Sequence, residues 1–274
     1  MTPQERAREA LEATRADGGE DEELEERLEE EARASRSAVR PIRDVPDQYV
    51  FRFEVGPAIL AMLLEKLEHI PRTPLLQSLD ARYPGFYQLF LRGEPKYIGK
   101  TARPVGVRLK EHVSKLYGRQ GIDLADMECR YAFVEDPSLV DVAEGALIAF
   151  FSERGMADWN TSGFGSKVPG HGRGGQRASA WAEVYPPDLR LPIGAGHEAP
   201  ITIFLLAQQI IKEAPITLSI PTQFRAAFKA AHSAPRAIPF AELPFEEWVR
   251  YLEGRLEPGW IVDRKPSGWY IVQA

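Results

Sequence analysis

Two β-rich runs, a tight turn and an amphipathic helix follow one another between residues 86 and 117. Phe86–Leu91 and Lys96–Thr101 flank an Arg-Gly-Glu-Pro turn, which predicts an antiparallel hairpin. Val105–Tyr117 repeats apolar residues at helical spacing, and Gly118 marks its expected end. This order predicts a sheet that begins with a hairpin and is followed directly by a helix.

The flanking segments extend this pattern into a mixed fold. Met127–Val134 is a third expected strand, and Asp141–Glu153 is a strongly apolar helix, so the core order is β-β-α-β-α. Upstream, Gln48–Val55 is expected as a strand and Pro57–His69 as an amphipathic helix. The expected fold class is α/β in the broad sense and α+β in detail, with a three-stranded antiparallel sheet flanked by helices.

The C-terminal part has a different composition and pattern. Helices are expected at 202–214, 221–232 and 245–256, followed by a hairpin of residues 260–262 and 269–272. Three helices and a hairpin are compatible with a winged-helix-like module. We therefore expect an acidic tail at residues 1–40, disordered or marginally helical, a central domain at 41–190 and a C-terminal helix-hairpin module at 191–274.

The acidic net charge belongs to one end of the chain. Residues 1–31 hold thirteen Asp or Glu and four Arg, a net of −9, so subtraction from −6 leaves +3 for residues 32–274. The overall charge is therefore no argument against a nucleic-acid partner. The acidic segment is expected to be a solvated tail, and the alternative is a DNA mimic that covers a basic groove.

Other features indicate where the protein is located and which kinds of site the sequence argues against. Apolar runs such as 203–207 are far shorter than the roughly 20 residues of a membrane span, and MTPQERAREA has no apolar signal region. A single cysteine, Cys129, excludes a disulfide within the chain. One Cys and five His without paired spacing argue against a zinc site. We expect a cytoplasmic protein with no membrane partner.

Six polar residues on these elements could carry chemistry. Tyr87 and Tyr97 lie on adjacent strands, where side chains of matched parity share a face. Arg108 and His112 are four residues apart and lie on one side of the next helix. Glu144 begins the apolar helix, and Asn160 follows it. Taken singly, the tyrosines could be core-edge residues, the Arg-His pair a solvated helix face, Glu144 a partly exposed first-turn residue and Asn160 a helix cap.

The ordered set resembles the GIY-YIG nuclease family over residues 85–160. The matching pieces are GFY at 85–87, YIGKT at 97–101, and then the Arg, Glu and Asn already named. Phe86 departs from the family's first motif at a position that commonly varies. The loop 160–181, NTSGFGSKVPGHGRGGQRASAW, also resembles the branch of homodimeric type II restriction endonucleases, in which a basic Gly-rich stretch ending in Arg and Trp follows the Asn.

The resemblance implies roles for the residues nearest the reaction. Glu144 would be the single protein carboxylate on Mg²⁺ (or Mn²⁺), with water and DNA oxygens completing the shell. Tyr87 would be the general base on water, which requires nearby cations to depress its pKa from about 10. His112, with a pKa near neutrality, would accept the proton from Tyr87 or act as the base itself.

The remaining residues would bind and orient. Arg108 would clamp phosphate, Tyr97 would orient the water or the scissile phosphate, and Asn160 would brace the site. Four cationic or titratable residues of the loop, with Lys100 of the second strand, are expected to contact DNA: Lys100, Lys167, His171, Arg173 and Arg177. For His171 the alternative is a place in a mobile loop without DNA contact.

The implied function is that of a metal-dependent type II restriction endonuclease that cuts double-stranded DNA at specific sites. A homodimer would suit a palindromic site, and a cognate DNA methyltransferase is expected in the host. The alternative is a GIY-YIG nuclease of DNA repair, mobile elements or structured DNA. A third hypothesis is a non-catalytic DNA-binding module on a degenerate nuclease scaffold, against which the intact Tyr, Arg and Glu argue.

Overall fold

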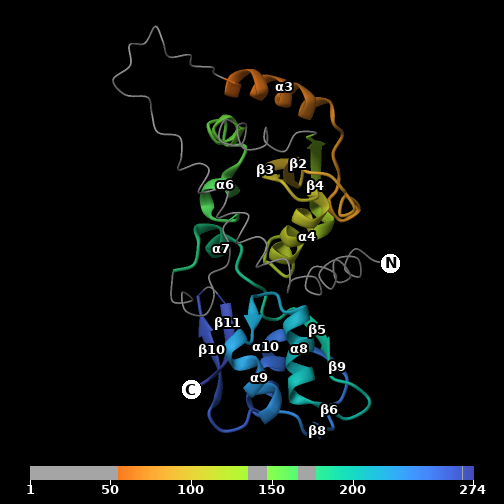
Figure 1. Ribbon diagram of the computed structural model, residues 1–274, viewed down its shortest axis with the longest axis vertical. Coiled ribbons are helices and arrows are strands. Elements are labelled where there is room, and N and C mark those ends of the chain that lie inside the picture. Colours follow the sequence, from red (N-terminus) through yellow and green to blue (C-terminus); the bar gives the residue numbers. More distant parts are fainter. Residues whose placement is uncertain (1–54, 135–146, 166–176, 267) are drawn as a thin grey trace.

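A computed structural model describes residues 55–134, 147–165, 177–266 and 268–274 (Figure 1). Most of the expected strand 48–55 lies outside these ranges, and Val55 itself begins a helix. In chain order the first part contains α3 (Val55–His69), β1 (Thr73–Pro74), η2 (Leu75–Gln77), β2 (Gly85–Leu91), β3 (Glu94–Thr101), α4 (Val105–Leu116), η3 (Leu124–Asp126), β4 (Met127–Phe133), a helical stretch at 147–152, α6 (Asp158–Ser162) and α7 (Ala180–Val184).

The central sheet has one strand more than the sequence predicts. Its order is β1-β4-β2-β3, and every neighbouring pair is antiparallel. The additional strand β1 pairs Thr73 with Cys129 and Pro74 with Glu128. A strand of two residues carries no alternation of polar and apolar side chains, so the expectation of three strands missed it.

The β2–β3 hairpin turns more tightly than expected. Arg92 (φ 52°) and Gly93 (φ 78°) both have positive φ, whereas Glu94 and Pro95 already belong to β3. Two central residues with positive φ are the requirement of a type I′ turn, whose twist matches that of the paired strands. The turn sets the pairing of Leu91 with Glu94, and a register shift between Leu89 and Phe90 then brings Tyr97 opposite Leu89.

The central sheet lies between two apolar layers. β2 is buried along its whole length, so its alternating side chains pack on both sides. Tyr87, Leu89 and Leu91 share one core with the apolar stripe of α4: Leu109, Val113 and Leu116. Phe86 on β2 and Ile98 on β3 face the other core, which also contains Leu67, Leu147 and Phe151. The sheet is thus covered by α4 on one face and by α3 with residues 147–152 on the other.

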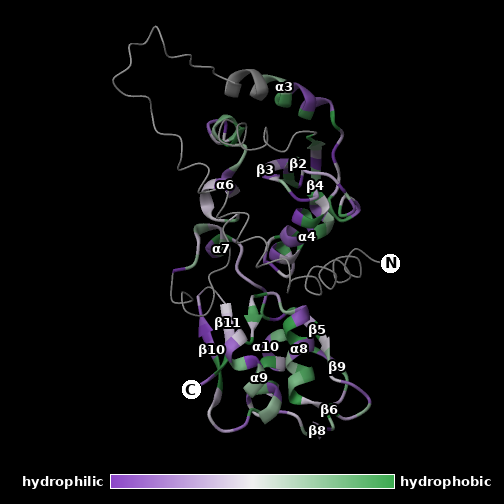
Figure 2. Ribbon diagram, viewed as in Figure 1, coloured by the Kyte–Doolittle hydropathy of each residue, from purple (hydrophilic) through white to green (hydrophobic). Residues whose placement is uncertain are grey.

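The C-terminal part has its own core around three helices (Figure 2). It contains β5 (Pro192–Ala195), β6 (Ile201–Thr202), α8 (Ile203–Glu213), β7 (Leu218–Ser219), α9 (Thr222–Ala231), β8 (Pro235–Arg236), β9 (Ala241–Pro244), α10 (Phe245–Glu253), β10 (Trp260–Lys265) and β11 (Gly268–Gln273). The expected hairpin is confirmed as β10–β11, and β7 adds a parallel strand to it. Hydrophobic residues follow much of α8, whereas α9 and α10 each carry both hydrophobic and polar residues.

One expectation for this part changes. The helix expected to reach residue 256 ends at Glu253, because Gly254 and Pro258 both disfavour continuing a helix. The two parts also touch, because Gly118 (φ 65°) lies against Pro215 and Leu191. The division at 190/191 remains a prediction. None of the helices within the described residues is long and apolar enough to cross a membrane.

Candidate active site

The register of β2 with β3 brings the two tyrosines together. Tyr87 is opposite Gly99, and Tyr97 is opposite Leu89, so the two phenol rings lie diagonally on the same face of the sheet. Their ring centroids are 6.1 Å apart. Both rings are buried in the core shared with α4, which confirms the parity argument from the sequence.

Gly99 is required by the same arrangement. A Cβ at this position would lie 2.6 Å from Cζ of Tyr87 and 2.7 Å from Cε1 of Tyr97, closer than real Cβ contacts come. The glycine of the YIG triplet therefore leaves room for the Tyr87 ring. Packing against the Tyr87 ring thus explains the glycine at position 99, which the periodicity of the sequence does not.

His112 joins the tyrosine pair from α4. Its Nε2 lies 2.8 Å from the hydroxyl of Tyr87, and both side chains are buried. The imidazole stacks on Phe164 with centroids 4.9 Å apart and ring planes at 21°, and it meets Tyr97 edge-on at 5.2 Å. Its Nδ1 is buried and has no hydrogen-bond partner among the described residues. This side of α4 is therefore not the solvated helix face that the residue types alone would suggest.

The charge states of this pair differ from the sequence expectation. Burial raises the pKa of Tyr87 well above its usual value, and the neighbouring Tyr97 adds to the rise, so the opposing effect of Arg108 does not prevail. Burial lowers the pKa of His112 well below its usual value, with further lowering by Arg108 and Lys115. The expected depression of the Tyr87 pKa and the near-neutral pKa of His112 were both wrong, because desolvation disfavours either charged form. With both groups neutral, the imidazole tautomer decides whether the phenol or Nε2 donates this hydrogen bond.

Arg108 supplies the cation beside this pair. Burial lowers the pKa of Arg108, but Tyr87 and Glu111 together raise it by more. The net pKa is above its usual value, so the guanidinium stays charged. Its Nη1 donates to Oε2 of Glu111, whose Oε1 accepts from Nη2 of Arg103 at 2.6 Å. About a quarter of the Arg108 side chain remains exposed. A charged, partly exposed guanidinium next to buried hydroxyls is suited to binding phosphate.

Lys115 completes the basic stripe of α4 and was missed in the sequence. Its Nζ donates to the carbonyl of Phe164 at 3.2 Å, which ties α4 to the ring that stacks on His112. Burial, with smaller contributions from Arg108 and Arg119, lowers the pKa of Lys115 to about 8. The overlooked signal was its spacing: Lys115 is three residues after His112, so the two share a helix face.

Asn160 braces β3 as expected. Its Oδ1 accepts from the backbone N–H of Ile98 at 2.9 Å, and its Nδ2 donates to the carbonyl of Ile98 at 2.7 Å. Ile98 directly follows Tyr97, so the amide fixes the strand that carries this ring. Asn160 lies on the short helix α6, which Gly163 ends with φ 96°.

Residues 86–190 match the family model described as the Eco29kI GIY-YIG domain, a type II restriction endonuclease family. This segment is a GIY-YIG domain. The match runs from β2 through α7 and includes all the site residues described above. No curated protein matches the chain. The GIY-YIG domain identifies an endonuclease, and a nuclease domain implies DNA as the substrate.

Several expected site residues of the GIY-YIG domain cannot be placed. Glu144, Lys167, His171 and Arg173 lie outside the described residues. Their roles on the metal ion and on DNA stay predictions.

The structure separates two further residues from the tyrosine pair. Lys100 is the cross-strand partner of Phe86, so strand alternation puts it on the sheet face opposite the tyrosines. Arg177 is 88% exposed and donates from Nε to Oε1 of Glu183 at 3.2 Å. An exposed pair of this kind contributes little to stability, so Arg177 could exchange Glu183 for another anion at small cost. DNA contact by either residue remains a prediction.

The donor atoms of the described residues set limits on a metal site. No group of three or more His, Cys, Asp or Glu that could hold a metal ion occurs in the described ranges. Glu111, the one carboxylate of α4, already binds two arginines. This donor set does not form a protein cage, but it fits a hard cation held by one further carboxylate and by phosphate oxygens.

Proposed function

We propose that this chain is a type II restriction endonuclease that hydrolyses phosphodiester bonds at specific sites in double-stranded DNA with the help of Mg²⁺ or Mn²⁺. The observation that carries the proposal is the buried Tyr87–His112 hydrogen bond beside the charged Arg108, in a segment that matches the Eco29kI family. GIY-YIG nucleases generally depend on a divalent metal.

Glu144 is the residue we assign to the metal ion. A divalent cation bound there would stabilise charge on the phosphoryl oxygens and on the leaving 3′ oxygen. The described side chains would do the rest of the work. Arg108 would bind a nonbridging phosphate oxygen, and Tyr97 would orient the water or the scissile phosphate from the same sheet face as Tyr87.

Proton removal from the water would use the Tyr87–His112 pair as a relay. In the tautomer that carries its proton on Nδ1, the phenol donates toward Nε2. A lone pair of the phenol oxygen would then accept a hydrogen bond from the attacking water. As Tyr87 takes a proton from water, its own proton passes to Nε2 of His112. Burial is the main reason that the pKa of His112 is low, and the charge of Arg108 lowers it further; a phosphate next to Arg108 would offset that second effect. The two roles that the sequence left open for these residues thus become parts of one transfer.

Three further assignments follow from this proposal. Two copies of the site related by a twofold axis would cut both strands of a palindrome, so we propose a homodimer. A host that carries such an enzyme would need a cognate DNA methyltransferase to protect its own sites. The DNA substrate also favours the cytoplasm as the place of action.

Digestion of phage and plasmid DNA with Mg²⁺, followed by sequencing of the product ends, tests the proposal. Discrete fragments with a common end sequence are expected, and parallel reactions in EDTA should leave the DNA intact. A smear without a common sequence would overturn the site-specific assignment. Cutting confined to flaps or junctions would favour a nuclease of repair, mobile elements or structured DNA. Binding without any cutting would favour the non-catalytic module.

A further inference from the structure

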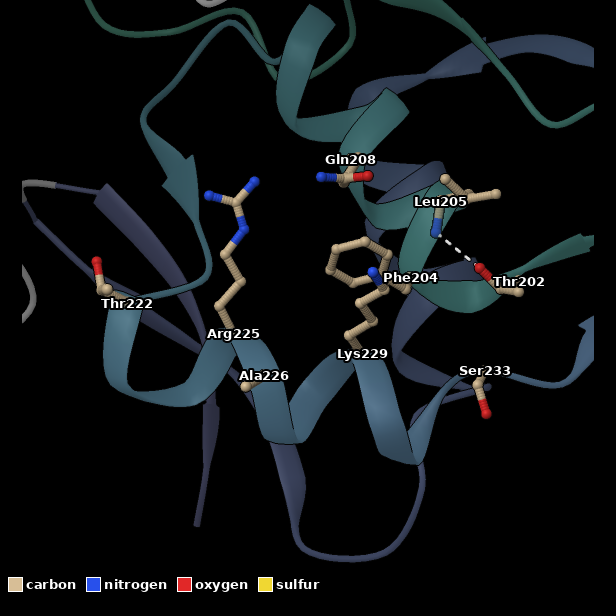
Figure 3. A pocket seen from close by; sticks show the side chains of 9 residues that line it. All are labelled: Thr202, Phe204, Leu205, Gln208, Thr222, Arg225, Ala226, Lys229 and Ser233. Atoms are coloured by element: carbon tan, nitrogen blue, oxygen red, sulfur yellow. Dashed lines mark hydrogen bonds between the residues drawn. The ribbon is translucent and has the colours of Figure 1, made fainter. Parts of the chain in front are cut away.

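A groove lies between α8 and α9, in the part of the chain that the family match does not cover (Figure 3). Its volume is about 820 Å³. Phe204 and Leu205 of α8 contribute apolar surface, and Arg225 and Lys229 of α9 contribute charge. Figure 3 shows both cationic side chains extending from α9 to the same side, with the amide of Gln208 across from them on α8. The groove therefore presents two cations along one rim.

These two cations are left without carboxylate partners in the described residues, unlike most of their neighbours. Arg236, Arg250 and Arg264 of the same part are each paired with a glutamate. Lys229 instead holds its ammonium 5.8 Å from the ring centroid of Phe204. Arg225 and Lys229 are both exposed and lie four residues apart, which puts their Cβ atoms about 5–6 Å from each other on one helix face.

The surrounding sequence keeps the field of this surface positive. No Asp or Glu occurs between Glu213 and Glu242, a stretch that includes all of α9. Elsewhere in residues 191–274 acidic and basic residues are interspersed. A helix that exposes two cations and carries no acid attracts an extended anion. Without a carboxylate, the same face of a second copy could not form ion pairs with it.

The small side chains of α9 would also let an anionic partner come close to the helix. Ala226, Ala227 and Ala230 are exposed next to the two cations, so no long side chain holds a partner away. Thr222 and Gln208 add hydroxyl and amide groups to the groove lining. Lys and Arg, helped by Thr and Gln, are the side chains that commonly contact phosphate oxygens of duplex DNA.

We propose that the Arg225–Lys229 face of α9, with Gln208 and Thr222, binds the phosphate backbone of the duplex that the GIY-YIG domain cuts. The proposal rests on the proposed function, because the same DNA must reach both parts. Figure 1 shows α9 in the lower, blue half of the molecule and the β2–β3 sheet in the upper half. The contact would therefore lengthen the stretch of DNA that the protein covers, and it would not by itself recognise a base sequence.

The salt dependence of DNA binding tests the contact directly. Binding of a labelled duplex in EDTA is measured by fluorescence anisotropy at several salt concentrations, for the full chain and for R225Q/K229Q. Two lost phosphate contacts should weaken binding at low salt and reduce the slope of log affinity against log salt by about 2, since each contact contributes about 0.9. The control R250Q/R264Q also removes two charges from this part, and it should keep the parent slope.

Single substitutions between the two cations make the test independent of charge loss. Ala226→Lys should tighten binding and steepen the slope by about 1, whereas Ala226→Glu should weaken binding. Ala226 is exposed, so both changes should leave the melting temperature near that of the parent. Parent-like affinity and slope in R225Q/K229Q and in both Ala226 variants would overturn the proposal.

Two other outcomes would also reject the α9 contact. If R225Q/K229Q keeps the parent salt slope but changes the sedimentation coefficient of the DNA-free protein, the groove is an interface between copies of this chain. An equal loss of DNA affinity and of salt slope in R250Q/R264Q would show that the overall positive charge, and not this face, attracts DNA. The proposed function itself fails separately, when the parent protein neither binds nor cuts any duplex.

Discussion

The hydroxyl of Tyr87 lies 2.8 Å from Nε2 of His112, and neither side chain is open to solvent. The two groups come from a strand and a helix, and the chain brings them together with Phe164 stacked on the imidazole. Both are neutral in the free protein, since burial opposes a phenolate and an imidazolium alike. The proposed proton relay would therefore start from two neutral groups.

Removing the phenol oxygen should stop the chemistry without unfolding the site. Tyr87→Phe keeps the ring over Gly99, and we expect single-turnover cleavage to fall by about 10²- to 10⁴-fold, the usual contribution of a general acid–base group. The buried Nε2 of His112 loses its partner, which should cost about 1–3 kcal/mol of unfolding free energy in urea. Tyr251→Phe, far along the chain, is the control. A Tyr87→Phe protein that cuts at the parent rate would exclude the relay.

Acid should destabilise the protein through His112. Its folded pKa is depressed, so its contribution to stability is present above the unfolded value of about 6.5 and is lost as pH falls toward the folded value. Urea unfolding between neutral and mildly acidic pH should show a steeper loss of free energy in the parent than in His112→Gln. His197→Gln, at an exposed position, should retain the parent slope. Equal slopes in all three proteins would mean that the pKa of His112 is the same in the folded and unfolded states, which would contradict the depressed pKa.

Gly99 should not tolerate even one methyl group. The added Cβ of Gly99→Ala meets the Tyr87 ring, and overpacking of this kind typically costs about 1–3 kcal/mol. Cleavage should fall as well, since the ring must shift away from His112. Gly254→Ala is a matched control, because its Cβ would meet nothing closer than 3.6 Å. Equal melting temperatures for the two variants would contradict the proposed fit.

The buried ammonium of Lys115 should make stability rise with pH. Its folded pKa of about 8 is depressed, so its contribution is fully present above the unfolded value of about 10.4 and is lost as pH falls through 8. From pH 8 to 9.5 the unfolding free energy of the parent should therefore rise relative to that of Lys115→Met. Cys129, whose pKa burial raises, has the opposite effect, but it is common to both proteins and cancels in the difference. Lys110→Met should behave as the parent does.

Cleavage should require both the divalent ion and Glu144. Glu144→Ala is expected to abolish Mg²⁺-dependent cutting while sparing DNA binding, because the assigned ligand is lost and Arg108 remains. EDTA should have the same effect on the parent, and added Mg²⁺ or Mn²⁺ should restore cutting only there. Glu153→Ala removes an exposed carboxylate nearby in the sequence and should cut normally. Full activity of Glu144→Ala would show that another residue holds the ion.

Much of the fold could be predicted because its signals are local. The β-rich run Phe86–Leu91, the helical spacing after Val105 and the hairpin at residues 260–272 each follow from neighbours in the sequence. Thr73–Pro74 escaped because a two-residue strand has no pattern of its own. Its pairing with Cys129 depends on a partner more than fifty residues away.

The sequence by itself determined which chemical groups are candidates for the site and in what order: two tyrosines, an arginine, a histidine, a glutamate and an asparagine. Only the tertiary structure decided their charge states and their support. Burial between the sheet and α4 keeps Tyr87 and His112 neutral. Glu111 anchors Arg108, and Lys115 and Asn160 hold Phe164 and Ile98 in place. Desolvation and contacts between distant segments depend on three-dimensional packing, which no spacing along the chain encodes.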